Sequence, residues 1–339
     1  MVRISRYLEN RTLHPRPWAH SALVEGFVRW TFAFPRKTRV RIENLAHLPQ
    51  DRPAIVVMNH TNIYNYVPFL AQLYWEYRAD PQWPFPAYGF WAKARFFHQP
   101  LAGRFLTACN VLPLPSRGYL ISKDFKDSCG RAPNHSQYRL LRDLVDGTVD
   151  RADFLRQADE ALRAFVTKPH NQFDPDRQAY ADFIEQQYER LMGLVMRISE
   201  QALLKQGINI LIFPEGGTST RLRQGQVGVA QLALKTNAPV VPVAGNQLDL
   251  LYPNLLPFSR GGEAVYRVGE PLTTADVLAP CAIDQPFVPF SRAAQLAYQD
   301  NFRTATGLIM ARLNELLDPA YQYAADAPPP KRQGANRFV

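Results

Sequence analysis

The sequence predicts an α/β fold, in which a mixed, largely parallel sheet is flanked by helices and interrupted by a helical insertion. Short runs rich in β-branched residues alternate with helical patterns along most of the chain, as in a sheet that is covered on both faces. A block from about residue 118 to 190 breaks this alternation, because it is polar, charged and helical in pattern. With 339 residues and 46% apolar composition, the chain can bury a core of this kind.

Five short segments have the composition and length of strands. The first alternates in polarity, the second is wholly apolar before it enters a loop, and the rest are rich in β-branched residues. They span residues 38–45, 54–60, 208–213, 239–244 and 263–268.

Helical periodicity follows or separates these strands. Residues 197–207 end in a glycine that fits a helix C-cap, residues 227–237 are apolar on one face, and residues 304–317 form a last amphipathic helix. We therefore expect an α/β domain over 38–323 and, because of its proline-rich polar composition, a disordered tail over 324–339.

The N-terminal residues predict a basic, membrane-associating arm over 1–37. Residues 1–41 hold nine arginines or lysines against two glutamates, and within them residues 22–34 are rich in large apolar and aromatic side chains. Such a segment suits the surface of an anionic membrane, but it is too short and too charged to span one. A basic arm can also bind nucleic acid, yet no recognition helix, zinc spacing or RNA-binding aromatic pattern accompanies it. We expect a peripheral protein on the cytoplasmic face of the membrane.

The three cysteines, Cys109, Cys129 and Cys281, are widely spaced and form no CxxC pair. This spacing argues against a disulfide framework or a zinc site, and it favours a reducing compartment.

Two loops at the ends of predicted strands carry the candidate chemistry. Asn59 and His60 end the strand at 54–60, which is where α/β folds place groups that contact ligands. The loop after the strand at 208–213 offers glycines that expose backbone N–H groups, hydroxyl donors and arginines, all suited to a phosphate. Its candidate binding residues are Gly216, Gly217, Thr218, Ser219, Arg221 and Arg223. The pattern GxxxxGK[ST] is absent, so a nucleotide P-loop is excluded.

Four motifs follow one another along the chain: NHTNIYN (59–65), NVLPLPSR (110–117), FPEGGTSTR (213–221) and VVPV (240–243). In this order the sequence resembles the glycerolipid acyltransferase family, which includes 1-acylglycerol-3-phosphate acyltransferases. The stretch before Arg117 is similar to the family's Ala-Lys…Pro…Gly…Arg pattern, with Lys93, Pro100 and Gly103 in place. The resemblance covers residues 38–117 and 191–318.

The resemblance implies transfer of a fatty acyl group from acyl-CoA or acyl carrier protein to a hydroxyl of a glycerophosphate or lysophospholipid-type acceptor, with neither cofactor nor metal. In that family the histidine is the general base, here His60, and Asn65 and Glu215 would complete the catalytic set. Arg117, Asn59 and the glycine-rich loop would bind the substrate, and an apolar groove would hold the acyl chain.

Two features depart from the family pattern. Asn65 stands where the family has aspartate, and the extra Gly217 shifts the residues that follow, so either Arg221 or Arg223 could hold the phosphate. An amide can accept the Nδ1–H of His60 but supplies no charge to balance an imidazolium. We expect an active enzyme. The alternative is a non-catalytic, membrane-associated protein of the same fold that binds lysophospholipid or acyl-CoA.

Overall fold

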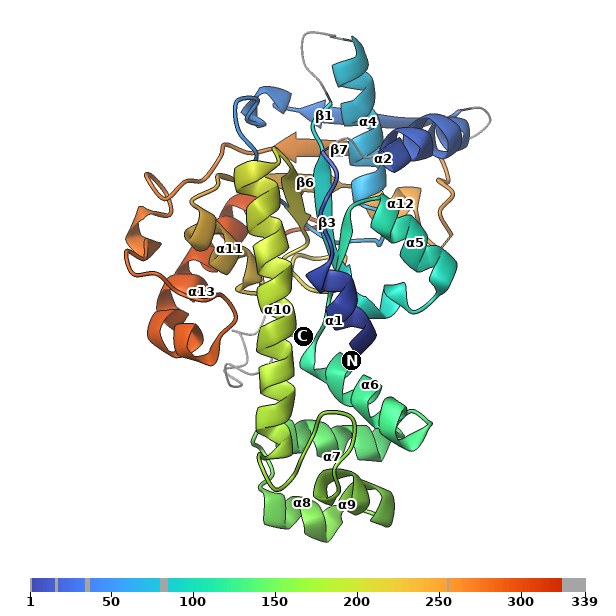
Figure 1. The fold of residues 1–339 in the computed structure, drawn as a ribbon. Helices are drawn as coiled ribbons and strands as arrows, with labels where there is room; N and C mark the ends of the chain where they lie inside the picture. The colour runs from blue at the N-terminus through green and yellow to red at the C-terminus, as the bar shows by residue number, and fades with distance from the viewer. Residues whose placement is uncertain (1, 16–17, 34–36, 80–84, 255, 325–339) are drawn as a thin grey trace.

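The computed structural model describes residues 2–15, 18–33, 37–79, 85–254 and 256–324. Its seven strands form one sheet in the order β1-β7-β6-β2-β5-β3-β4 (Figure 1). Neighbouring strands are parallel except for β6 and β7, which are antiparallel, so the predicted mixed, largely parallel sheet is confirmed. The strands are β1 (Thr38–Glu43), β2 (Ile55–Met58), β3 (Tyr88–Lys93), β4 (Val111–Leu114), β5 (Asn209–Ile212), β6 (Val240–Asn246) and β7 (Gly262–Val268).

The helices cover both faces of this sheet and build a lobe beyond it. They are α1 (Val2–Glu9), α2 (Trp18–Ala22), α3 (Arg29–Phe32), α4 (Tyr66–Ala79), α5 (Pro100–Ala108), α6 (Arg117–Cys129), α7 (His135–Val145), α8 (Arg151–Gln157), α9 (Glu160–Thr167), α10 (Tyr180–Lys205), α11 (Gly228–Thr236), α12 (Leu248–Leu251) and α13 (Arg292–Glu315). A π-helical turn, η1 (Leu23–Val28), joins α2 to α3, and short 3₁₀ turns lie at η2 (Leu45–His47), η3 (Ala94–Phe97) and η4 (Ala279–Cys281).

The alternation of side chains along the central strands divides the interior into two cores. Ile55 and Val57 of β2 point into a core built with α10, α11 and α13, whereas Val56 and Met58 point into a core built with α4 and the N-terminal helices. All four side chains are fully buried. This placement fixes the register of β2, and with it the position of the loop that follows.

Residues 118–190, expected as a helical insertion, form helices α6 to α9 and the first turns of α10. Figure 1 shows α7, α8 and α9 as a lobe below the sheet, with α10 running from that lobe up along the sheet. Because α10 is 26 residues long, the lobe and the α/β core share one continuous helix.

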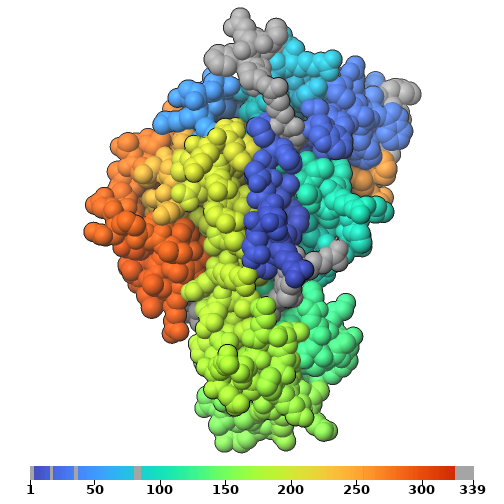
Figure 2. Space-filling model, viewed as in Figure 1, coloured from blue at the N-terminus to red at the C-terminus, as the bar shows by residue number. Residues whose placement is uncertain are grey.

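Part of the N-terminal stretch expected as a membrane-associating arm over 1–37 is packed into the domain, and its association with a membrane stays a prediction. Leu8 and Leu13 are buried in the first core, and Val24 and Val28 in the second. Figure 2 shows α1 lying along α10, and Glu9 of α1 pairs with Arg190 of α10 at 2.7 Å. The predicted tail over 324–339 lies outside the described residues from 325 onward.

Candidate active site

Three adjacent strands bring the candidate residues to one edge of the sheet. His60 follows β2, the loop with Glu215 follows β5, and Lys93 is the last residue of β3. Since β2, β5 and β3 are neighbours and parallel, their carboxyl ends meet at the same edge. The strand order thus gathers residues that are more than one hundred positions apart in the sequence.

Glu215 ties the two principal loops together. Its side chain, only 7% exposed, accepts hydrogen bonds from the backbone N–H groups of His60 (2.7 Å) and Arg223 (2.9 Å). The backbone N–H of Ser219 also donates to the carbonyl oxygen of His60 at 2.8 Å. Burial raises the pKa of Glu215 to about 7, against the effect of the two N–H donors. In this structure Glu215 positions the loop of His60, because both of its oxygens bind backbone.

The His60 ring is neutral at pH 7 and open at one nitrogen. It stacks on Phe213, with ring centroids 4.1 Å apart. Neither ring nitrogen forms a hydrogen bond with a described residue. Nδ1 is buried, whereas Nε2 reaches solvent. Burial lowers the pKa of His60 to about 4, and the positive charge of Lys93 acts in the same direction, against a smaller opposing effect of the Asn62 backbone. Burial and the charge of Lys93 both disfavour the imidazolium.

Asn65 makes no hydrogen bond to the His60 ring in this structure, and its catalytic role stays a prediction. The side chain is fully buried. Its Oδ1 accepts hydrogen bonds from the backbone N–H of Asn62 (2.7 Å) and the hydroxyl of Thr61 (3.3 Å), and its Nδ2 donates to the carbonyl oxygen of Asn59 (3.0 Å). Asn65 therefore closes the turn that follows His60.

The Asn59 side chain binds the backbone of a neighbouring strand, and its assignment to substrate binding stays a prediction. Its Nδ2 donates to the carbonyl oxygen of Gly245 (2.9 Å), and its Oδ1 accepts the N–H of the same residue (2.7 Å). The side chain thus continues the pairing of β2 with β6 beyond the end of β2, and it is only 2% exposed.

The glycine-rich loop faces solvent beside a cation that was not among the predicted site residues. Gly216 has a φ of +69°, which favours glycine and lets the chain turn directly after β5. The ammonium group of Lys93 lies 3.9 Å from the point where a side chain on Gly217 would begin. The Lys93 side chain is exposed as a whole, but partial burial of its ammonium group, together with the charge of Arg95, lowers its pKa. The exposed side chains of the loop are Thr218, Thr220, Arg221 and Arg223.

Arg117 lies elsewhere, in an ion pair that links the start of α6 to α10. Ser116 caps α6 by accepting the N–H of Tyr119, which makes Arg117 the first helical residue. Its guanidinium donates twice to Glu185 of α10, at 2.5 and 2.6 Å, and lies over the ring of Tyr188. The side chain is 5% exposed, and Nη1 is buried without a partner. In this structure the charge of Arg117 is already taken by Glu185, and its role as a ligand for phosphate stays a prediction.

Lys93 and Glu185 are the residues whose roles the sequence did not reveal. Lys93 is the last residue of β3, a strand that the sequence pattern does not predict, and strand ends are where α/β folds place groups that contact ligands. Nothing in the sequence pairs Arg117 with Glu185, because the two residues are 68 positions apart and meet only when α10 packs on α6.

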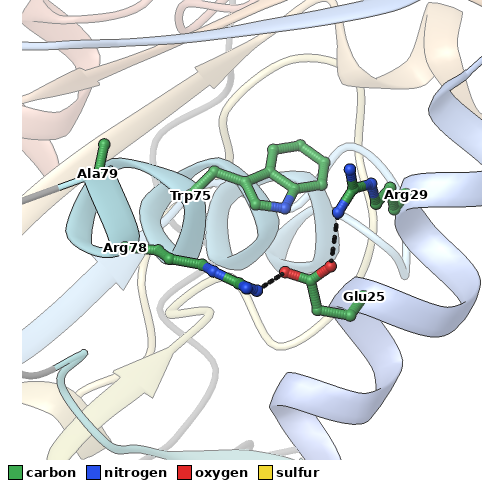
Figure 3. Close-up of a pocket in the computed structure, with 5 residues that line it drawn as sticks. All are labelled: Glu25, Arg29, Trp75, Arg78 and Ala79. Atoms are coloured by element: carbon green, nitrogen blue, oxygen red, sulfur yellow. Dashed lines mark hydrogen bonds and ion pairs between the residues drawn. The ribbon is translucent and has the colours of Figure 1, made fainter.

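A hollow on another part of the surface does not belong to this site. It is lined by Glu25 and Arg29 of the N-terminal helices and by Trp75, Arg78 and Ala79 of α4 (Figure 3). Glu25 bridges Arg29 (3.0 Å) and Arg78 (2.6 Å) across it. The helix α4 starts near the His60 turn and rises about 1.5 Å per residue, so Trp75 lies well away from His60.

Within the described ranges, no cluster of three or more histidines, cysteines or carboxylates could hold a metal ion.

Comparison with known proteins identifies the family. The Acyltransferase family model matches residues 39–141 and 174–245, just over half of the chain. A solved structure, that of the 1-acyl-sn-glycerophosphate (LPA) acyltransferase PlsC from Thermotoga maritima, aligns with a TM-score of 0.37 and 13% sequence identity, over 92% of this chain and 96% of that chain. The curated proteins searched include no significant match. The chain is a member of the Acyltransferase family.

Proposed function

We propose that the protein transfers a fatty acyl group from a thioester, acyl-CoA or acyl carrier protein, to a hydroxyl of a phosphorylated glycerolipid acceptor of the lysophospholipid type. One observation carries this proposal. A neutral histidine with an open Nε2 lies at the same sheet edge as a glycine-rich loop and three exposed cations, Lys93, Arg221 and Arg223.

The chemistry follows from the state of the His60 ring. With its hydrogen on Nδ1, the ring presents a lone pair at Nε2, which takes the proton of the acceptor hydroxyl as the oxygen attacks the thioester carbonyl carbon. The tetrahedral intermediate then expels the thiolate by breaking the C–S bond, and the imidazolium returns the proton to the thiolate sulfur. The products are an ester and a free thiol, and His60 is neutral again.

The loop and its cations suit the phosphate of the acceptor. The exposed side chains of Lys93, Arg221 and Arg223 form no ion pair within the described residues, although the charge of Arg223 acts to lower the pKa of Glu215. A phosphate dianion binds such groups through charge-assisted hydrogen bonds, and backbone N–H groups of a glycine-rich turn add to them. Arg117, whose charge Glu185 neutralises, is left out of this site.

The N-terminal helices support the proposal of peripheral binding to an anionic membrane at its cytoplasmic face. Trp18 is 74% exposed and Trp30 is 70% exposed, and the exposed Arg29 lies between them in the sequence. Tryptophan and arginine suit the interface between headgroups and acyl chains. None of the helices that the structure describes is both long and apolar enough to cross a bilayer.

A direct assay tests this function. Purified protein is given radiolabelled acyl-CoA or acyl carrier protein together with lysophosphatidate, and the acylated lipid is quantified. We expect turnover by the wild type, complete loss in His60→Ala, and unchanged turnover in His135→Ala, whose histidine is exposed on the lobe. If the wild type binds lysophosphatidate but acylates nothing, the protein is the non-catalytic binder, an outcome that the unpartnered Nδ1 of His60 would then explain.

A further inference from the structure

The segment that leads from β3 to α6 contains no acidic residue. Between Asp80 and Asp124 the sequence has five basic residues and not a single aspartate or glutamate. Within this segment η3 and α5 connect β3 to β4. The basic residues are Lys93, Arg95, Arg104, Arg117 and Lys123.

Helix α5 is apolar, yet none of its residues is buried. Leu101 is 80% exposed and Phe105 is 46% exposed, and Phe96 of η3 adds a third large apolar side chain at 42%. Arg104 lies on the same face of the helix, because positions three and four residues after Leu101 are its neighbours on a helix surface. We call Phe96, Leu101, Arg104 and Phe105 the α5 face.

The opposite side of α5 is held firmly against the protein. Thr107 binds the hydroxyl of Tyr7 (3.0 Å) through Oγ1, and its carbonyl oxygen accepts from Arg11. Gly103 lies so close to η3 that a side chain there would begin 3.2 Å from the carbonyl oxygen of Phe97. The exposure of the α5 face is therefore a fixed feature of the fold and not the result of a loosely attached helix.

This face adjoins both the candidate site and the N-terminal helices. The turn η3 begins directly after Lys93, at the sheet edge where His60 and the glycine-rich loop lie. Helix α2 packs on α5, and Figure 1 shows α2 and α5 on the same side of the molecule, opposite α13. A surface that meets α2 and α5 together would come up to the edge of the candidate site.

We propose that the α5 face binds the surface of an anionic bilayer, as a second membrane contact beside the N-terminal helices. The proposal rests on the proposed function, since it explains how a lipid acceptor reaches His60. Three large apolar side chains would enter the headgroup region, while Arg95 and Arg104 would contact lipid phosphates. Arg117 and Lys123 are paired with carboxylates outside this stretch, but the exposed Lys93, Arg95 and Arg104 form no ion pair within the described residues, and their charge is complementary to such a surface.

Vesicle binding tests the proposal without any need for turnover. Full-length protein is sedimented with vesicles of phosphatidylcholine and phosphatidylglycerol, or of phosphatidylcholine alone. We expect Leu101→Gln/Phe105→Gln to bind the mixed vesicles about tenfold more weakly. The control is Leu296→Gln/Val288→Gln, which changes two apolar residues that are also exposed, at 75% and 66%, on the α13 side; it should bind like the wild type. Arg104→Gln should weaken binding only where phosphatidylglycerol is present.

Two results would overturn the proposal. The first is unchanged vesicle binding in Leu101→Gln/Phe105→Gln. If this variant instead loses binding to acyl carrier protein, the α5 face binds that acidic protein and not the membrane. The second comes from enzyme assays. If the variant loses as much activity on a short-chain, monomeric acceptor as on a vesicle-embedded one, the α5 face acts within the site and not on the membrane. Failure of the proposed function leaves the vesicle test intact, because binding is measured without acyl transfer.

Discussion

The carboxylate of Glu215 accepts the backbone N–H of His60 at 2.7 Å, so the acid of the FPEG motif holds the histidine by its main chain and not by its ring. The second oxygen takes the N–H of Arg223 and secures the far end of the same loop. One buried side chain thereby fixes the distance between the candidate base and the candidate phosphate loop. The contribution of Glu215 to activity should therefore pass through the stability of this arrangement.

We expect Glu215→Gln to lower the free energy of unfolding by about 1–3 kcal/mol, because the amide group can accept only one of the two N–H bonds and points hydrogens at the other. Urea unfolding at pH 7 measures this loss. Activity should fall with it, as the loops separate. A variant as stable as the wild type but without activity would show instead that Glu215 takes part in the reaction itself.

For the replacement Asn65→Asp, the sequence and the structure lead to opposite expectations. The sequence predicts a gain in rate, with the carboxylate supporting the His60 ring. In the structure the Nδ2 of Asn65 donates to the carbonyl oxygen of Asn59, and a buried carboxylate would oppose that oxygen. We therefore expect a stability loss of about 1–3 kcal/mol and no increase in rate.

Urea unfolding and initial rates of Asn65→Asp, measured side by side, decide between the two. A variant that is as stable as the wild type and at least tenfold faster, about 1.4 kcal/mol in the barrier, would mean that residue 65 turns toward Nδ1 of His60. Asn65 would then support the ring of His60 and not merely close the turn that follows it.

Arg117 should matter for stability and not for the choice of acceptor. We expect Arg117→Ala to cost about 2–3 kcal/mol of unfolding free energy, because it leaves the carboxylate of Glu185, 23% exposed, without its partner. Removing both groups, in Arg117→Ala/Glu185→Ala, should cost less than the sum of the single changes. A selective loss of activity on phosphorylated acceptors in Arg117→Ala would restore this arginine to the binding site.

Periodicity and motif order in the sequence predict five of the seven strands and the two loops that carry the candidate site. Five strands were found because their β-branched runs are long enough to recognise, and His60 and the loop after β5 were placed at strand ends. Strands β3 and β4 were missed. One contains a glycine and a lysine, and the other is a four-residue edge strand with Pro113 inside it, which an edge tolerates.

The roles of Asn59, Asn65 and Arg117 could not be read from the sequence for a different physical reason. A motif shows which side chains are present, but the hydrogen bonds they form depend on groups brought in from distant strands and helices. Gly245 takes both polar groups of Asn59, and Glu185 takes the charge of Arg117, across separations of 186 and 68 residues. Only the folded chain shows these partners.

Lys93 should determine both the acceptor and the pH dependence of the reaction. We expect Lys93→Gln to lower kcat/KM for a phosphorylated acceptor about 10- to 100-fold, the contribution of one charge-assisted hydrogen bond, and to change a neutral acceptor little. Because the positive charge of Lys93 helps to lower the pKa of His60 to about 4, its removal should also raise that pKa. The active form of His60 is the neutral one, so a higher pKa means that protonation begins at a higher pH. With a neutral acceptor, the rate of Lys93→Gln should therefore start to fall at a higher pH than that of the wild type as the solution is acidified.

The control is Lys205→Gln, which removes the same charge from an exposed position at the end of α10 and should leave both properties unchanged. Equal losses on phosphorylated and neutral acceptors, with the acid limb unmoved, would place Lys93 outside the site.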